Sequence, residues 1–339
     1  MNQNQPNIKD VAAKAGVSIA TVSRVLNNKR GFSKSTYDKV QIAMEELGYQ
    51  PNRVAQALKS ESMKMIALSV PFIWHPFYAE FAYYIEADLQ NRGYGMLLSN
   101  NQSDPSSEQK FLKMAQENKV DGIIGITYND IVPYLSTNIP FVSIDRFFDT
   151  SEYPTVATIT SDNFHGGEIA AHELIQRGAK KLAFVGTYAN YPNGSLNRKK
   201  GFLEVIEHNQ IPYQIFECSE TDPQAPLLLD RVINNLDTID GIFAVNDETA
   251  YQLLFKLKNY AIKIPDELQI IGYDGFQIMP NITPSLSSIV QPVKEIARVA
   301  VDDLIKLIEH DSNISHNTTI PVSFRAAQTT KNLSQPKFL

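Results

Sequence analysis

Apolar residues near the N-terminus recur at intervals of three and four, which predicts short amphipathic helices. A first helix begins at Asn7 and ends before Gly16, because glycine tolerates the left-handed backbone of a tight turn. Ser18 and Ser33 are good N-caps for a second and a third helix, and the third continues to Leu47. The chain is therefore expected to begin with a small bundle of three helices.

The second of these helices has two different faces. Val22, Val25 and Leu26 lie three and four residues apart and are expected to pack on the first helix. Small and polar groups suit a DNA major groove, where they meet thymine methyls, base edges and phosphates. The pattern predicts a helix-turn-helix, although an ordinary helical hairpin has the same spacing. The residues of this second face are Ile19, Ala20, Ser23, Arg24 and Asn27.

From Met65 onward the pattern changes to short apolar strands that alternate with helices. This alternation indicates parallel sheets with helices on both faces, and a chain of 339 residues is long enough for two such lobes. The predicted strands are Met65–Val70, Gly95–Ser99, Gly122–Thr127, Phe141–Asp145, Val156–Thr160, Leu182–Gly186, Gln214–Cys218, Gly241–Val245, Gln269–Tyr273 and Leu286–Ile289. Predicted helices include Phe77–Arg92, Ser106–Asn118, Gly166–Arg177 and Val293–Glu309.

These patterns predict a small all-α helix-turn-helix headpiece followed by an α/β body of two doubly wound parallel-sheet lobes. The expected boundaries are 1–50 for the headpiece, 51–61 for a hinge helix and linker, 62–331 for the body and 332–339 for a tail. Within the body, the N-lobe is expected at about 62–161 plus 293–323, and the C-lobe at about 162–291 plus 324–331.

The charge is distributed unevenly between these parts. The whole chain carries a net charge of −6, but residues 1–61 carry +4 and the remainder −10. A basic headpiece on an acidic body confines attraction for phosphates to the headpiece. The single cysteine, Cys218, excludes an internal disulfide, and the polar N-terminus has no export signal. A cytoplasmic protein is therefore expected.

Polar and aromatic residues follow the predicted strands, and in open α/β sheets ligands bind beyond the carboxyl ends of the strands. Aromatic faces, carboxylates, amides and an arginine in one cleft suit a sugar, whose hydroxyls need hydrogen bonds and whose C–H face packs on rings. Taken singly, Asp145 or Asp274 would also serve as a helix cap, Gln291 as a partner for backbone at a lobe crossing, and Phe147 or Phe148 as core. The segments that follow the strands are 72–78, 100–102, 145–148, 162–164, 193–198, 246–247, 274–275 and 291–292.

Nothing in the sequence indicates an enzyme. The six histidines show no metal-ligand spacing, and there is no nucleophile elbow or phosphate loop. Neither a metal nor a cofactor is expected.

The segment from Ile8 to Leu58 closely resembles the DNA-binding headpiece of the lac repressor/galactose repressor family of bacterial transcription regulators. The runs Thr21–Asn27 and Pro51–Ala55 carry this resemblance, which covers the headpiece without a gap. It implies that Arg24 reaches base edges and that residues 52–58 form a hinge helix on operator DNA. Leu58 would then enter a minor-groove base step. The implied DNA-binding residues are Ile19, Ala20, Thr21, Ser23, Arg24, Asn27, Asn52, Arg53, Ala55 and Leu58.

The body resembles the periplasmic ribose/galactose-binding fold on which this family builds its regulatory domain. By that resemblance Phe77 and Tyr78 match stacking aromatics. The residues that match hydroxyl-binding positions are Asp145, Arg146, Arg198, Asn246, Asp274 and Gln291, and Phe164 completes the expected effector site.

The family resemblance implies a repressor of a carbohydrate-utilisation operon, controlled by a small sugar between the lobes and bound as a homodimer to a pseudo-palindromic operator. The tail shows no heptad repeat, so the tetramerising helix of the lac repressor is not expected. A ribose-like monosaccharide is favoured as effector, while sucrose or a sugar phosphate held by Arg146 and Arg198 stays open. The alternative is a solute-binding protein for sugar transport, which would require export.

Overall fold

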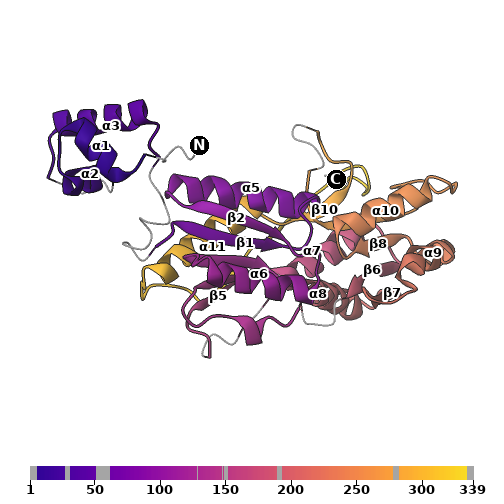
Figure 1. Ribbon diagram of the computed structural model, residues 1–339. Coiled ribbons are helices and arrows are strands. Elements are labelled where there is room, and N and C mark those ends of the chain that lie inside the picture. The colour runs from indigo at the N-terminus through magenta and orange to yellow at the C-terminus, as the bar shows by residue number, and fades with distance from the viewer. Residues whose placement is uncertain are drawn as a thin grey trace. The chain divides into compact units, whose positions relative to one another are not determined.

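The computed structural model divides into two compact units, Met1–Met63 and Lys64–Leu339 (Figure 1). It describes residues 6–26, 31–50, 62–127, 129–146, 148, 152–188, 193–277 and 282–333. No helix among these residues is both long and apolar enough to cross a bilayer.

The headpiece consists of α1 (Ile8–Ala15), α2 (Ile19–Leu26) and α3 (Lys34–Leu47). Gly16 ends α1 in the left-handed conformation, with φ at 64°. Ser18 accepts a hydrogen bond from the Thr21 backbone at 3.1 Å, and Ser33 accepts one from Thr36 at 3.1 Å. Both predicted serine caps are therefore present at the starts of their helices.

The three helices close over a small apolar core. Its buried residues come from all three helices and sit on the faces that the sequence pattern predicts. They are Val11, Ala12, Val22, Val25, Val40 and Ala43. Because Val22 and Val25 of α2 are buried in this core, the opposite face of α2 faces away from the bundle.

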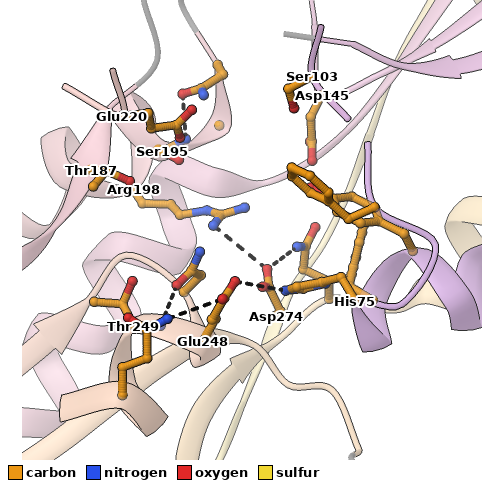
Figure 2. Close-up of a pocket in the computed structure, with 18 of the residues that line it drawn as sticks. His75, Ser103, Asp145, Thr187, Ser195, Arg198, Glu220, Glu248, Thr249 and Asp274 are labelled. Carbon is orange, nitrogen blue, oxygen red and sulfur yellow. Dashed lines mark hydrogen bonds and ion pairs between the residues drawn. The ribbon is translucent and has the colours of Figure 1, made fainter. Parts of the chain in front are cut away.

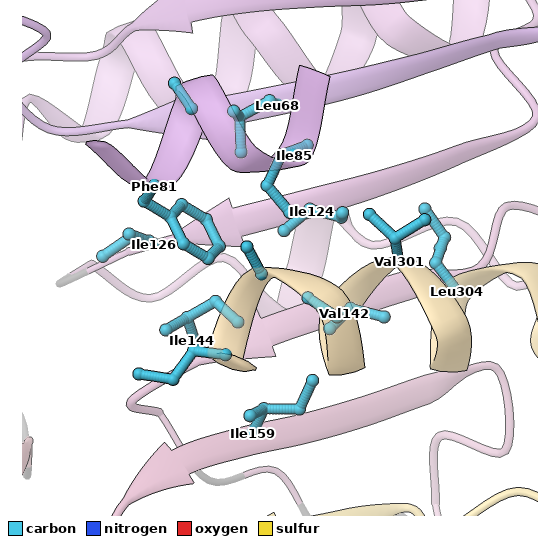
Figure 3. Close-up of a cluster of buried hydrophobic side chains, with 14 of the residues drawn as sticks. Leu68, Phe81, Ile85, Ile124, Ile126, Val142, Ile144, Ile159, Val301 and Leu304 are labelled. Carbon is cyan, nitrogen blue, oxygen red and sulfur yellow. The ribbon is translucent and has the colours of Figure 1, made fainter. Parts of the chain in front are cut away.

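The N-lobe contains a six-stranded sheet in the order β11-β5-β4-β3-β1-β2, in which every pairing is parallel. Helices α5 and α11 pack on one face of the sheet, around Phe81, Ile85, Val301 and Leu304 (Figure 3). Helix α6 covers the other face. The elements are β1 (Met65–Val70), α5 (Pro76–Asn91), β2 (Gly95–Asn100), α6 (Pro105–Glu117), β3 (Gly122–Ile126), β4 (Phe141–Ile144), β5 (Val156–Ser161), α11 (Val293–Ile308) and β11 (Asn317–Ile320), with a short 3₁₀ turn η1 (Val132–Tyr134).

The C-lobe contains a second six-stranded sheet, in the order β12-β10-β9-β8-β6-β7. Helices α7 and α8 pack on one face, α9 and α10 on the other. Only the edge strand β12 pairs antiparallel. The elements are α7 (Asn163–Gln176), β6 (Leu182–Tyr188), α8 (Gly194–His208), β7 (Tyr213–Ser219), α9 (Leu228–Ile233), β8 (Gly241–Ala244), α10 (Asp247–Leu257), β9 (Gln269–Asp274), β10 (Ser287–Val290) and β12 (Ser323–Arg325), with 3₁₀ turns η2 (Ala225–Leu227) and η3 (Leu236–Thr238).

The predicted fold class is confirmed, and each of the ten predicted strands overlaps an observed one. Strands β11 and β12 were missed, because Asn-Thr-Thr-Ile and Ser-Phe-Arg are too short and polar to show an apolar run. The chain passes between the lobes three times within the described residues: after β5, after β10 and between β11 and β12. These three crossing segments connect the two lobes, and a cavity lies beside them.

Candidate functional site

The outward face of α2 is the first candidate surface. Ile19, Ala20 and Arg24 are exposed, whereas Thr21 and Ser23 are half-buried. The Thr21 hydroxyl lies 2.9 Å from the Ser18 hydroxyl, so part of its hydrogen-bonding capacity is used at the helix start. Ile19, Ala20 and Arg24 are thus the side chains of α2 that are most available to a ligand.

The remaining predicted DNA-binding residues stay predictions. Asn27, Asn52, Arg53, Ala55 and Leu58 lie outside the described residues.

The second candidate is a cavity of about 430 Å³ in the body, with walls from both lobes (Figure 2). A volume of this size is typical of small-molecule sites. Its N-lobe wall consists of Phe72, His75, Phe77, Tyr78, Ser103 and Asp145. Its C-lobe wall includes Thr187, Asn193, Ser195, Arg198, Glu220, Asn246, Glu248, Thr249, Gln252 and Asp274, and Gln291 lies at a crossing.

Arg198, which α8 contributes, is held in a fixed position in the C-lobe wall. Its Nε donates to Asn163 Oδ1 at 2.8 Å and its Nη1 to the Val245 carbonyl at 2.9 Å. The guanidinium stacks 3.6 Å from the centroid of the Tyr273 ring, and its Nη1 lies 3.8 Å from Asp274 Oδ1. The side chain is buried, so these contacts fix its orientation before any ligand enters.

Two aspartates end strands at the cavity in left-handed backbone, Asp145 with φ at 58° and Asp274 with φ at 112°. Non-glycine residues seldom adopt this conformation, and such strain gathers at functional sites. Burial raises the pKa of Asp274 to about 6, although Arg198 acts in the opposite direction. Burial likewise raises the pKa of Asp145, which accepts from the Ser161 backbone and the Asn163 amide, both at 3.3 Å.

Gln291 connects the two crossings next to the cavity. Its Oε1 accepts from the Ser161 hydroxyl at 2.6 Å, and its Nε2 donates to Asp274 Oδ1 at 2.7 Å. Its side chain, at the crossing after β10, thus bonds to Ser161 at the crossing after β5 and to Asp274 at the end of β9. The side chains that cap helices next to the cavity are those of Asp162, Asn193 and Asn246, so neither Asp145 nor Asp274 serves as one.

Asn246 has two tasks, because it lines the cavity while its Oδ1 accepts from the Thr249 backbone at 2.8 Å to cap α10. Phe148 is buried in the N-lobe core, with its ring centroid 6.1 Å from that of Phe141. Phe148 is therefore a core residue, as the alternative prediction has it, and not a cavity residue.

The lobes also touch across the cavity. His75 Nε2, at the start of α5, lies 3.7 Å from Glu248 Oε2 on α10 (Figure 2). The His75 ring lies 5.5 Å from Phe276, edge to face, and 5.0 Å from Tyr78. Burial lowers the pKa of His75, while Glu248 raises it to a smaller extent. At neutral pH the contact therefore depends mainly on a neutral imidazole.

Of the nine predicted effector residues, seven line this cavity: Phe77, Tyr78, Asp145, Arg198, Asn246, Asp274 and Gln291. Arg146 and Phe164 do not. The Arg146 guanidinium lies 3.5 Å from Asp130 and 5.2 Å from the Phe148 ring centroid. The left-handed backbone of Asp145, with φ at 58°, turns the chain after β4, and Arg146 points to Asp130 rather than into the cavity.

Phe164 instead lines a second cavity of about 400 Å³, together with Lys200 and Thr319. In α7 it follows Asn163, whose side chain faces Asp145 and Arg198, and one helical step of roughly 100° turns Phe164 away.

The sequence analysis did not select His75, Glu220 or Glu248. His75 lies inside the segment that follows the first strand, and Glu248 directly follows the segment chosen after β8. Glu220 follows β7, an edge strand whose end was not searched. The same rule of strand ends would have found all three. Among the described residues no group of histidines, cysteines or carboxylates could hold a metal ion.

Two family descriptions match the chain. Residues 7–52 match "Bacterial regulatory proteins, lacI family", and residues 171–330 match "Periplasmic binding protein-like domain". The sucrose operon repressor of Streptococcus mutans is 39% identical over 305 residues, which cover 89% of this chain and 93% of that protein. The ribose operon repressor of Halalkalibacterium halodurans is 33% identical over 328 residues, covering 96% and 97%.

Solved structures agree with the fold. A periplasmic binding protein/LacI transcriptional regulator from Alkaliphilus metalliredigens, complexed with D-xylulofuranose, has a TM-score of 0.71 at 29% identity, covering 79% of this chain and all of that one. The lac repressor dimer bound to operator and an anti-inducer has a TM-score of 0.80 at 22% identity, covering 96% and 99%. The second likeness concerns the fold alone.

Proposed function

The chain belongs to the lacI family of bacterial regulatory proteins, and from this premise we propose that it represses a sugar-utilisation operon under the control of a saccharide bound between its lobes. The headpiece binds the operator, with Arg24 as the side chain that reads base edges. An exposed arginine in the recognition helix suits bidentate contact with guanine. Since homologues of this kind act as repressors on the chromosome, we place the protein in the cytoplasm and assign it no catalytic activity.

The observation that carries the regulatory part is the composition of the cavity walls. Aromatic rings come from the N-lobe, in Phe77 and Tyr78, and the buried charged groups Arg198 and Asp274 come from the C-lobe. A sugar offers an apolar C–H face to such rings and hydroxyls to carboxylates and amides.

We favour a disaccharide of the sucrose type over a ribose-like monosaccharide. The relatives from Streptococcus mutans and Lactococcus lactis that are named sucrose operon repressors are 39% and 35% identical to this chain. The cavity volume of about 430 Å³ corresponds to roughly fourteen waters at ~30 Å³ each, which leaves space for two sugar rings.

The two-lobed cavity supplies a route from sugar to DNA. A ligand that touches both walls favours one angle between the lobes, and it shifts the equilibrium only by its difference in affinity for the two arrangements. The predicted hinge segment, residues 51–61, would transmit this angle to the headpiece. So short a helix is marginal alone, so its folding on DNA is sensitive to how its two copies are placed.

We propose that the protein acts as a homodimer, because a pseudo-palindromic operator presents two half-sites. Two aromatic side chains on the surface of the body support an interface with a second copy: Tyr83 on α5 is 68% exposed and Phe255 on α10 is 70% exposed. Figure 1 shows α5 and α10 along the same side of the body. A Tyr83→Glu/Phe255→Glu variant should sediment as a monomer, while the wild type should sediment as a dimer.

The direct test is the binding of purified full-length protein to a palindrome upstream of its own gene, measured by fluorescence anisotropy. We expect preference over random duplex, steep dependence on salt, and a change in affinity on addition of sucrose. Arg24→Ala should remove most of the sequence preference and leave the salt dependence nearly intact. Equal affinity for palindrome and random duplex would refute the proposed repressor.

A further inference from the structure

The cavity carries an excess of negative charge. Four carboxylates line it, whereas Arg198 is the one arginine in the described lining, and this lining contains no lysine. The carboxylates are Asp145, Asp274, Glu220 and Glu248.

The single arginine is committed to the protein. Its Nε and Nη1 are used by Asn163 and the Val245 carbonyl, and its charge lies between Asp274 and the Tyr273 ring. An anionic ligand could pair fully with the Arg198 guanidinium only by disrupting these buried contacts.

Nearby cations do not compensate. Lys199 pairs with Glu217 at 2.8 Å, and Lys200 lines the second cavity rather than this one. Arg146, which sequence analysis considered for a phosphate, pairs with Asp130 and is absent from the lining. The described residues thus offer a phosphate no uncommitted cationic partner inside this cavity.

Glu220 and Glu248 differ from the two aspartates in being exposed to the cavity space. Figure 2 shows them on either side of Arg198, and the hydroxyls of Thr187, Ser195 and Thr249 belong to the same cavity lining. Hydroxyls accept and donate whereas a carboxylate accepts, so this lining fits sugar hydroxyls, which do both.

We propose that this cavity selects uncharged saccharides and rejects their phosphate esters, and that Glu220 and Glu248 set this selectivity. The inference rests on the proposed sugar-responsive function. A sugar hydroxyl donates to these carboxylates, whereas a phosphate at neutral pH carries nearly two negative charges and only accepts. Because the cavity is partly open to solvent, salt should weaken this repulsion, so the comparison is made at low ionic strength.

The experiment compares ligands by titration calorimetry on full-length protein at pH 7.5. The ligands are sucrose, sucrose 6-phosphate, glucose, glucose 6-phosphate and glucosamine. The wild type should bind each neutral sugar at least roughly tenfold more tightly than its phosphate, a difference of about 1.4 kcal/mol. Glucosamine should bind at least as tightly as glucose, since the carboxylates that repel a phosphate attract an ammonium group.

The variants are Glu220→Gln, Glu248→Gln and the double substitution, because glutamine keeps the shape and removes the charge. The double variant should reduce the preference for the neutral sugar roughly tenfold. Glu204→Gln, at an exposed position of α8 that does not line the cavity, removes the same charge and should leave the preference unchanged. A urea unfolding transition like that of the wild type shows that the body of each variant folds.

Three results overturn the inference. The first is a wild type that binds the phosphate as tightly as the neutral sugar, or glucosamine less tightly than glucose. The second is a double variant whose preference equals that of Glu204→Gln. The third is operator binding without binding of any sugar, which overturns the proposed effector class together with this inference, whereas the first two leave sugar control intact.

Discussion

The two walls of the cavity differ in kind. The N-lobe contributes mainly rings, with Phe72, Phe77 and Tyr78, and the C-lobe contributes most of the charge, with Arg198 and Asp274 already bonded in place. Neither wall alone satisfies a sugar, because one offers stacking and the other offers hydrogen bonds. A ligand that needs both walls must bridge the lobes, and a bridging ligand is one that can set the angle between them.

The largest effect is expected where the C-lobe wall is broken. Arg198→Ala removes the buried cation between Asp274 and Asn163, which should lower the free energy of unfolding by about 3 kcal/mol. Sugar binding should fall below detection, while operator binding by the separate headpiece unit persists. Urea unfolding and calorimetry measure the two losses. A variant with wild-type sugar affinity would show that the C-lobe charges do not hold the ligand.

A second prediction concerns pH and Asp274. Because its folded pKa is raised to about 6, the protonated form is favoured in the fold, and stability is lost as pH rises from the ordinary value of 3.8 through 6. Sugar binding should show the opposite trend, since the ionised carboxylate is the better acceptor for a hydroxyl.

Asp274→Asn should therefore reduce the loss of stability between pH 4 and about 6, and Asp145 and Asp247, whose pKa values burial also raises, should account for part of the remainder. It should also flatten the pH dependence of sugar affinity. Thermal unfolding and calorimetry across this range provide the check. An unchanged pH profile in the variant would assign the titration to another group.

The N-lobe wall should give a smaller loss. Tyr78→Ala removes a ring that lines the cavity, and we expect sugar affinity to fall roughly tenfold, or about 1.4 kcal/mol. Tyr78→Phe keeps the ring and should stay close to wild type, which separates stacking from hydrogen bonding through the hydroxyl. If the phenylalanine variant lost as much as the alanine variant, the N-lobe wall would act through polar contact and the contrast between the walls would fail.

The smallest effect is expected at the contact between the walls. His75→Ala removes the contacts with Glu248 and Phe276, and the sugar affinity should change about threefold, or ~0.6 kcal/mol. A decrease in sugar affinity would show that this contact favours the sugar-bound arrangement of the lobes, and an increase would show that it opposes that arrangement. Calorimetry at pH 7.5 measures it, with His165→Ala as a control because His165 is exposed on α7 and pairs only with Glu168 nearby. If His75→Ala changed the sugar affinity no more than His165→Ala does, the contact of His75 with Glu248 and Phe276 would have no role in sugar binding.

The sequence predicted the parallel strands well because each has an apolar run, as in Gly122–Ile126, all of which is buried. It predicted the position of the cavity because strand ends in parallel sheets meet at one edge. It failed for Arg146, since the direction of a side chain after a strand depends on local backbone, here the left-handed turn at Asp145. It also missed Glu220, which follows an edge strand with a partly exposed apolar pattern.

The central claim is that the sugar cavity and the operator surface are energetically coupled, and linkage makes this coupling reciprocal. The most direct measurement is the sugar Kd of full-length protein alone and of protein saturated with operator duplex. The account predicts that the two values differ at least roughly tenfold, by the same factor as the change in operator Kd caused by sugar. Equal sugar affinities in the free and the DNA-bound protein would contradict it.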